Sequence, residues 1–352
     1  MNRHRTSRRQ FVAGTLAAGG MWLGTGCGKN DPNRREVVVY SSIDDVYARA
    51  MAEAFTTRTG IEVRLVTDTE ETKSTGLLNR LIAEGNRPQA DVFWSGDAMR
   101  AAILKQRGLA RPILSEELKA YPDEHRDPDG QLARFSARLR VLLFHRDRVP
   151  ESSRPKSIHD LAHPRFRGRS CLANPLFGTT SMHAAALFET LGESAARQFF
   201  QSLDSNDVRM LSSNGEVRRR VASGEFDLGL TDSDDASVAL LDRQPVGFVL
   251  PDQDGMGTLL VPSAAVLIQS GPHPAEGQRF IDHLLSAEGE QFLADSSAAQ
   301  IPLRRGLATP PMFGRPLTDL RTLNLDPDRL GRRLAELQDG FLRDWVASRM
   351  AR

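Results

Sequence analysis

The chain has 352 residues, which is enough for two domains or one large one and too long for a miniprotein held by disulfides. Hydrophobic residues make up 40% and charged residues 26%, a globular composition that excludes wholesale disorder and a polytopic membrane protein. Without residues 1–26, which hold four arginines and no acid, the formal charge falls from +1 to −3; this argues against a nucleic-acid partner, because no excess positive charge remains.

The first 26 residues have the pattern of a signal peptide. They begin with a basic stretch, and an apolar run rich in Gly and Ala follows from residue 11 to about residue 23, too short to span a membrane. Arg8 and Arg9 stand just ahead of this run, which resembles the twin-arginine signal for export of a folded chain. The sequence therefore predicts a periplasmic or other extracytoplasmic location.

Cys27 follows this run and resembles a lipobox cysteine, which becomes the acylated first residue of a mature lipoprotein. Gly24 stands where that motif favours Leu, so plain cleavage of the signal peptide stays open as an alternative. Residues 27–35 are polar and suit a tether between the lipid and the domain. Cys171 is then the one remaining cysteine, and we expect it to be a small buried residue in a strand.

From Glu36 onward, apolar runs of strand length alternate with helical patterns. Continuous apolar strands of this kind are typical of a parallel sheet that helices cover on both faces. The first three units have strands at residues 37–40, 61–66 and 90–94, followed by helices at residues 46–59, 75–85 and 98–107.

A second set of alternating units comes after a polar stretch. Its strands are expected at residues 138–144, 170–174, 208–211 and 226–231, and its helices at residues 182–191, 195–205 and 217–223, with a short helix and a turn within residues 157–166. A strand at 263–269 could return to the first set, ahead of helices at 275–285 and 288–296. The sequence therefore predicts an α/β fold with two sets of units.

Several short motifs occur in one order along the chain. They are VYSS at 39–42, TGIEV at 59–63, PQADVFW at 88–94, NP at 174–175 ahead of a Gly-Thr-Thr helix start, SGE at 223–225 and SAEGE at 286–290. This order resembles the periplasmic solute-binding proteins of ABC importers. More narrowly, it is similar to the branch that includes ferric-ion binders, with relatives for thiamine, polyamines and organophosphonates, and the resemblance covers residues 36–305.

The resemblance implies a two-lobed α/β fold of the type 2 periplasmic-binding-protein kind, with the solute in a cleft between the lobes. We assign residues 36–137 and 263–310 to lobe 1, residues 138–262 to lobe 2 and residues 311–352 to C-terminal helices. The two crossover hinge strands are then residues 138–144 and 263–269. The resemblance also implies permease and ATPase subunits as partners and a monomer that meets the membrane only through its N-terminal lipid.

In ferric binders of this type, a loop of the second lobe carries two adjacent tyrosines, and the first loop often carries a histidine. Here Asp234 and Asp235 stand at the tyrosine positions, and Asp44 stands where the histidine would. The three tyrosines of the chain all lie outside that loop, at positions 40, 47 and 121. The sequence therefore predicts that a cation is held by carboxylates, with no tyrosinate iron site.

Five aspartates are expected at loop ends that converge on one cleft: Asp44, Asp97, Asp232, Asp234 and Asp235. Unpaired carboxylates would repel one another and raise one another's pKa values, so the cluster implies a cationic ligand, either a hard metal ion or an ammonium group. If the solute is a metal ion, Asp234, Asp235 and Asp44 would hold it. No cofactor is required. The structural alternative is an Asx-rich turn whose carboxylates lie in water.

A second group of candidates has anion-binding chemistry. Hydroxyls and backbone N–H groups are expected at helix N-termini, where the helix dipole favours negative charge. Residues 213–216 also match a capping box, a helix start whose side chains bond to backbone N–H groups and need no ligand. These candidates are Gly178, Thr179, Thr180, Ser213 and Asn214, joined at the ends of the first and third strands by Ser41, Ser42 and Ser95.

The solute itself stays open at this point. A metal with a bridging anion satisfies both groups, and so does a zwitterion such as an aminophosphonate, while polyamine-type or thiamine-type solutes fit the same branch. The competing class is a Mg-dependent phosphohydrolase that uses residues 232–235. We expect no enzyme, because the chain shows no catalytic triad pattern and no Gly-rich phosphate loop with a lysine.

The N-terminal signals make a testable prediction. Replacing both Arg8 and Arg9 by Lys should block export of the folded protein, because the twin-arginine receptor reads the paired guanidinium groups. Cys27→Ser should release the exported protein from the membrane fraction. Cell fractionation with immunoblotting checks both, and normal export of the double-Lys variant or membrane retention of the Ser variant would contradict the respective assignment.

Overall fold

The computed structural model describes residues 35–68 and 75–350. The predicted signal peptide, the twin arginines, Cys27 and nearly all of the tether lie outside the described residues. Within them, no helix is both long enough and apolar enough to cross a membrane.

The first half of the fold is a parallel arrangement of β1 (Glu36–Ser41), β2 (Glu62–Thr67) and β3 (Val92–Ser95). Val37, Val39 and Val92 are fully buried, as expected for strands covered on both faces. The helices of this half are α1 (Asp45–Thr59), α2 (Thr75–Glu84), α3 (Ala98–Gln106), α8 (Pro274–Leu285) and α9 (Ala287–Asp295). Their existence and order match the prediction, with ends that shift by at most one residue.

The second half is built on β6 (Ser170–Ala173), β7 (Arg209–Leu211) and β8 (Leu228–Asp232), which are also parallel. Cys171 is buried in β6, as predicted. The structure adds a helix and a strand that the sequence analysis missed, α7 (Ser233–Leu241) and β9 (Val246–Val249). The predicted helices of this half are α4 (Gly178–Leu191), α5 (Glu193–Ser205) and α6 (Asn214–Ala222).

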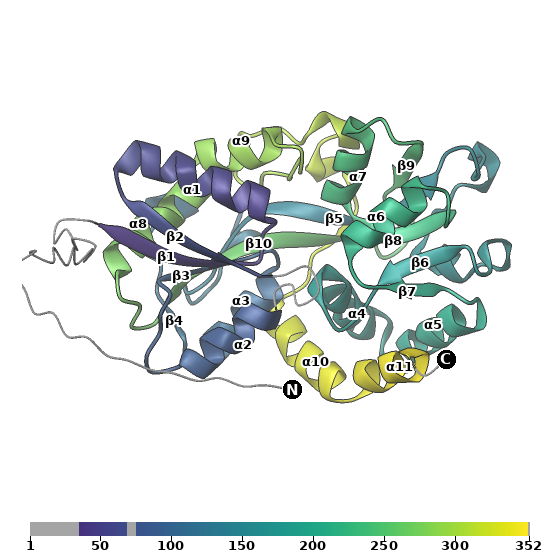
Figure 1. The fold of residues 1–352 in the computed structure, drawn as a ribbon, viewed down its shortest axis with the longest axis horizontal. Helices are drawn as coiled ribbons and strands as arrows, with labels where there is room; N and C mark the ends of the chain where they lie inside the picture. The colour runs from purple at the N-terminus through teal and green to yellow at the C-terminus, as the bar shows by residue number, and fades with distance from the viewer. Residues whose placement is uncertain (1–34, 69–74, 351–352) are drawn as a thin grey trace, which may run out of the picture. The chain divides into compact units, whose positions relative to one another are not determined.

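Two long strands, β5 (Ala133–His145) and β10 (Thr258–Ile268), run through both halves (Figure 1). β10 pairs with β3 and with the first part of β5, whereas residues 140–144 of β5 pair with β8. The strand order is β2-β1-β3-β10-β5-β8-β6-β7. These are the two predicted crossover strands, although each begins five residues earlier than expected; the lobe boundaries themselves stay a prediction.

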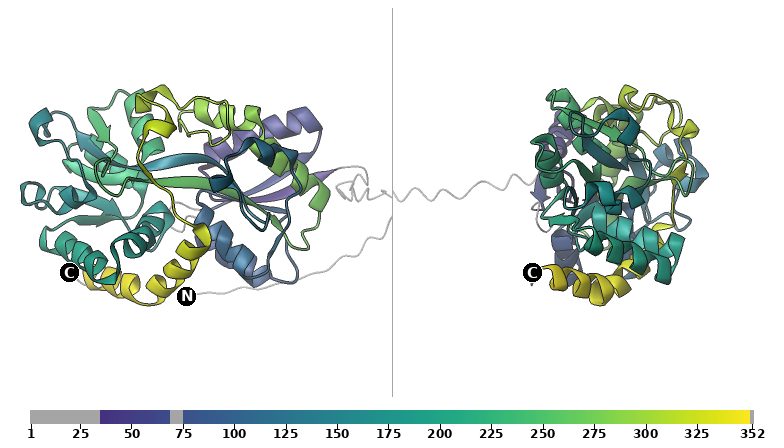
Figure 2. Two further views of the ribbon diagram at one scale, coloured as in Figure 1. Left: turned by 180° about the vertical axis from the view of Figure 1, so that it is seen from behind. Right: turned by 90° about the vertical axis from the view of Figure 1, so that its right-hand side faces the viewer.

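The C-terminal segment contains α10 (Pro327–Asp339) and α11 (Phe341–Met350), seen in yellow in Figure 2. α10 packs against both α3 and α4. Lys105 of α3 binds Asp328 at 2.8 Å, and Arg333 pairs with Glu193. The short elements are β4 (Ala110–Arg111), β11 (Thr322–Leu323) and the 3-10 turns Glu116–Ala120, Asp123–His125, Glu151–Ser153, Ile158–Ala162, Pro164–Phe166, Pro311–Phe313 and Leu317–Asp319.

Both crossover strands are irregular at facing positions. Ser136 of β5 has a positive φ of 36°, which is rare for a non-glycine residue, and the pairing register shifts opposite it between Pro262 and Ser263 of β10. The carboxylate of Glu290, on α9, is fully buried and accepts hydrogen bonds from the backbone N–H groups of Ser136, Leu303 and Arg304. Glu290 therefore fixes the bulge of the crossover strand.

Glu290→Ala should lower the free energy of unfolding by about 3 kcal/mol, because it leaves backbone N–H groups without an acceptor in the interior. The control is Glu288→Ala on the same helix, where the side chain is 72% exposed and the change should stay within about 0.5 kcal/mol. Urea unfolding of both variants measures this difference. Equal stability of the two would mean that the bulge does not depend on Glu290.

Candidate functional site

The N-terminal ends of α1, α4, α6 and α7 meet around one cavity with a volume of about 60 Å³. This is room for a few water-sized groups. Ten of the thirteen predicted ligand-binding residues line it: Ser42, Asp44, Gly178, Thr179, Thr180, Ser213, Asn214, Asp232, Asp234 and Asp235. The other lining residues include Tyr47, Gly96, Arg138 and Arg218.

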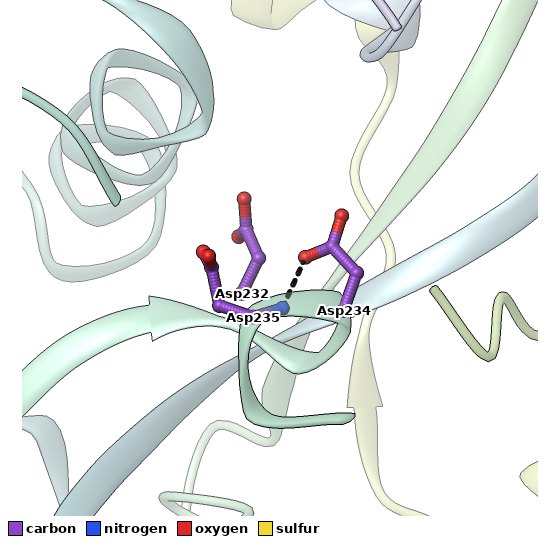
Figure 3. A group of neighbouring side chains, drawn as sticks. All are labelled: Asp232, Asp234 and Asp235. Atoms are coloured by element: carbon purple, nitrogen blue, oxygen red, sulfur yellow. Dashed lines mark hydrogen bonds between the residues drawn. The ribbon is translucent and has the colours of Figure 1, made fainter. Parts of the chain in front are cut away.

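Three of the aspartates form a compact group (Figure 3). Asp232 ends β8 and is the N-cap of α7, while Asp234 and Asp235 lie in the first turn of that helix. One carboxylate oxygen from each lies within 4.8 Å of those of the other two. The expected loop at this position is therefore the start of a helix, and the dashed bond in Figure 3 runs from the Asp235 N–H to Asp234 Oδ1, at 3.0 Å.

Arginines from β5 pair with this group, which corrects the expectation of unpaired carboxylates. Arg140 Nη1 lies 2.7 Å from Asp232 Oδ1, and Arg138 Nη1 lies 3.0 Å from Asp234 Oδ2. Arg218 of α6 lies 3.8 Å from Asp235. A cluster of acids alone thus does not require a cation, because three guanidinium groups already balance the three carboxylates.

The predicted anion-binding residues of α4 and α6 take part in the same network. Thr179 Oγ1 donates to Asp232 Oδ2 at 2.6 Å and accepts from Arg140, whose guanidinium also donates to Thr180 Oγ1. Asn214 Nδ2 donates to Asp232 Oδ2 as well. These side chains hydrogen-bond to one another, so much of their hydrogen-bonding capacity is already used within the protein.

Ser213 caps α6 as predicted, but the capping box is incomplete, because Glu216 bonds to Ser212 and not to the N–H of Ser213. Ser213 Oγ accepts from the Glu216 N–H at 3.1 Å, and the Glu216 carboxylate accepts from the backbone N–H and the hydroxyl of Ser212. Ser42 Oγ accepts from the Gly96 N–H at 2.9 Å. Each hydroxyl therefore has a structural task, whatever it does for a ligand.

Three predicted site residues, Asp97, Ser41 and Ser95, do not line the cavity. Asp97 is the buried N-cap of α3 and pairs with the fully buried Arg100 at 2.7 Å. Ser41 Oγ accepts from a neighbouring backbone N–H, and Ser95 Oγ accepts from the Asp97 N–H. Arg100 also donates to Ser181 Oγ and to the Gly178 carbonyl, so the Asp97–Arg100 pair ties α3 to the start of α4.

Tyr47 is a phenol at the cavity that the sequence analysis did not assign to the site. It lies in the first turn of α1, is 9% exposed and lines the cavity with Asp44 and Asp234. Its hydroxyl shares a hydrogen bond of 2.8 Å with Ser297 Oγ. Burial raises the pKa of Tyr47, and the nearby Asp234 and Asp44 add to this, so the phenol is neutral near neutral pH.

The three aspartates have divergent pKa values. Burial raises the pKa of Asp232, but Arg140 and Arg138 outweigh it, so the pKa lies below its ordinary value. Burial also raises the pKa of Asp234, and here Arg138 does not fully offset it. Burial and the neighbouring Asp234 raise the pKa of Asp235 to about 7. Asp235 is thus the carboxylate that exchanges its proton near neutral pH.

The sequence analysis missed the two arginines that β5 contributes to the site. Arg138 and Arg140 alternate with Leu139 and Val141, so both side chains lie on one face of β5. Two buried arginines in such a strand require acceptors, and this signal was available in the sequence.

Comparison with known proteins agrees with this geometry. The sequence model of the bacterial extracellular solute-binding protein family matches residues 36–296, and the chain belongs to this family. It is 28% identical to "Iron uptake protein A1" of Synechocystis sp., over 94% of this chain and 96% of that protein. It is 24% identical to the "Fe(3+)-binding periplasmic protein" of Serratia marcescens, over 84% and 86% of the two chains.

Among solved structures, iron-bound HitA from Pseudomonas aeruginosa superposes with a TM-score of 0.79 and 26% identity, covering 88% of this chain and 99% of that one. The predicted two-lobed α/β periplasmic-binding fold and the resemblance to the ferric-binding branch are thereby confirmed. The chain is a solute-binding protein and not an enzyme, so the phosphohydrolase alternative is set aside.

The raised pKa of Asp235 predicts a pH dependence of stability. Between its ordinary value of 3.8 and about 7, the folded protein holds a proton that the unfolded chain releases. This contribution is fully present below pH 4 and is lost as the pH rises through 7. The free energy of unfolding should therefore fall over this range, by up to about 1.4 kcal/mol per pH unit.

Asp235→Asn should remove this part of the slope, which chemical unfolding of wild type and variant at several pH values measures. Because other titrating groups are common to both proteins, only the difference between the two slopes counts. Parallel pH profiles would show that Asp235 titrates normally.

Proposed function

We propose that the chain is the extracytoplasmic receptor of an ABC importer and that its cleft binds a small cationic solute, with iron(III) as the leading candidate. The observation that carries the proposal is the group of three carboxylates, whose oxygens lie within 4.8 Å of one another at the cavity. Carboxylate oxygens are the donors that hard cations prefer. Such a protein passes its solute to permease and ATPase subunits.

The donor set fits a hard cation from two sides. Asp234 and Asp235 lie at the start of α7, and Asp44 and Tyr47 line the same cavity from the start of α1. Closing two halves of the protein on one ion lets ligands from both contribute, and the phenol adds a donor that deprotonates when a highly charged ion binds. The names of the relatives, which refer to iron uptake and Fe(3+) binding, support the same cargo.

A solute that carries both an amine and an acidic group is the second candidate. Arg138 and Arg218 line the cavity together with the helix N-termini of α4 and α6, which favour a negative group. An aminophosphonate-like zwitterion would place its amine at the aspartates and its oxygens at these groups. Anchoring of the receptor through lipid at Cys27 belongs to this proposal as well.

Replacing Asp234 and Asp235 together by Asn should weaken iron(III) binding by more than tenfold. Each lost charge-assisted contact costs roughly 1.5 to 3 kcal/mol. The control is Asp45→Asn: Asp45 is exposed, pairs with Arg49 at 2.5 Å and does not line the cavity, so affinity should stay unchanged. Calorimetric titration with iron(III) nitrilotriacetate compares the three proteins.

If wild type and the double variant bind iron(III) equally, the aspartates are only partners of the arginines. If wild type binds no iron(III) but binds an aminophosphonate, the second candidate replaces the first.

A further inference from the structure

We propose that Arg138 is a resident counter-cation, which an incoming solute must displace from Asp234, and that it thereby determines which cations the cleft accepts. This inference rests on the proposed function, because it concerns the same carboxylates. It assigns a specificity role to a residue of the crossover strand β5.

The first observation is how Arg138 is held. Its Nη1 donates to Asp234 Oδ2 at 3.0 Å, and its Nη2 donates to the Gly96 carbonyl at 2.5 Å. Its Nε is buried and has no hydrogen-bond partner among the described residues. The guanidinium therefore sits at the cavity wall, between the loop before α3 and the start of α7, with part of its donor capacity unused.

The second observation is the contrast with Arg140, two residues along the same face of β5. The Arg140 side chain is fully buried and donates to Asp232, Thr179, Thr180 and Asn214. Arg140 does not line the cavity, whereas Arg138 does. Arg140 is thus enclosed by the fold, and Arg138 is the arginine that a solute in the cavity would meet.

Charge balance gives the selectivity. With Arg138, Arg140 and Arg218 in place, the three carboxylates of the group are formally neutralised. A monovalent cation that displaces Arg138 replaces one positive charge by another, so the net electrostatic contribution to its binding free energy is small. An ion of higher charge is attracted to the carboxylates more strongly than the arginine it displaces. The resident arginine therefore favours multivalent cations over simple amines.

The test is Arg138→Met, which keeps the length of the side chain and removes its charge. Iron(III) nitrilotriacetate and methylammonium serve as probes in calorimetric titrations. The variant should bind iron(III) roughly tenfold tighter or more, because no charge-assisted bond has to be broken, and it should gain measurable affinity for methylammonium. Arg138→Lys, which keeps the positive charge but not the forked guanidinium, should tighten iron(III) binding less than Arg138→Met does.

Arg140→Met is the matched control two residues away, and it should lower the melting temperature without tightening iron(III) binding. Unchanged or weaker iron(III) binding by folded Arg138→Met would overturn the role of Arg138. If this variant and Arg138→Gln both fail to fold, the side chain is structural and the inference also fails. Wild type that binds no iron(III) would instead contradict iron(III) as the solute in the proposed function.

Discussion

Two buried ion pairs determine the electrostatics of this cleft. They lie where β5 changes its pairing partner from β10 to β8. From β5, Arg140 reaches Asp232 at the end of β8 and Arg138 reaches Asp234 in the first turn of α7, and all four side chains are nearly inaccessible to solvent. A buried charge without a partner is costly by several kcal/mol, so each arginine stabilises the aspartate with which it pairs, and loss of either partner lowers the stability of the fold. The end of β8, the start of α7 and the register of β5 therefore depend on one another.

The same pairs divide the acids into two kinds. Asp232 is enclosed by Arg140, Thr179 and Asn214, so it is ionised and fixed. Asp235 has a hydroxyl partner, Thr231, and a more distant arginine, so burial governs its protonation. Residues only three positions apart thus differ in their ionisation, and their hydrogen-bond and ion-pair partners make the difference.

Sequence patterns located the fold and the acids well, because strand and helix periods and three acids after an apolar strand are local signals. They missed α7, since Ser and Asp favour turns and helix N-termini alike, and both interpretations fit residues 232–235. They also missed the partners of the acids, because Arg138 and Arg140 lie 96 and 92 residues from them along the chain. No local pattern specifies which distant charges a fold brings together.

The location of these arginines links the cleft to the connection between the halves. Arg138 lies opposite Val261 of β10, and Arg140 lies opposite Asp232 of β8, so β5 changes its pairing partner between them. Two residues before Arg138, the bulge at Ser136 is held by Glu290. A solute that alters what Arg138 contacts therefore acts on the crossover strand itself, next to its most irregular point, and needs no relay of intervening residues to do so.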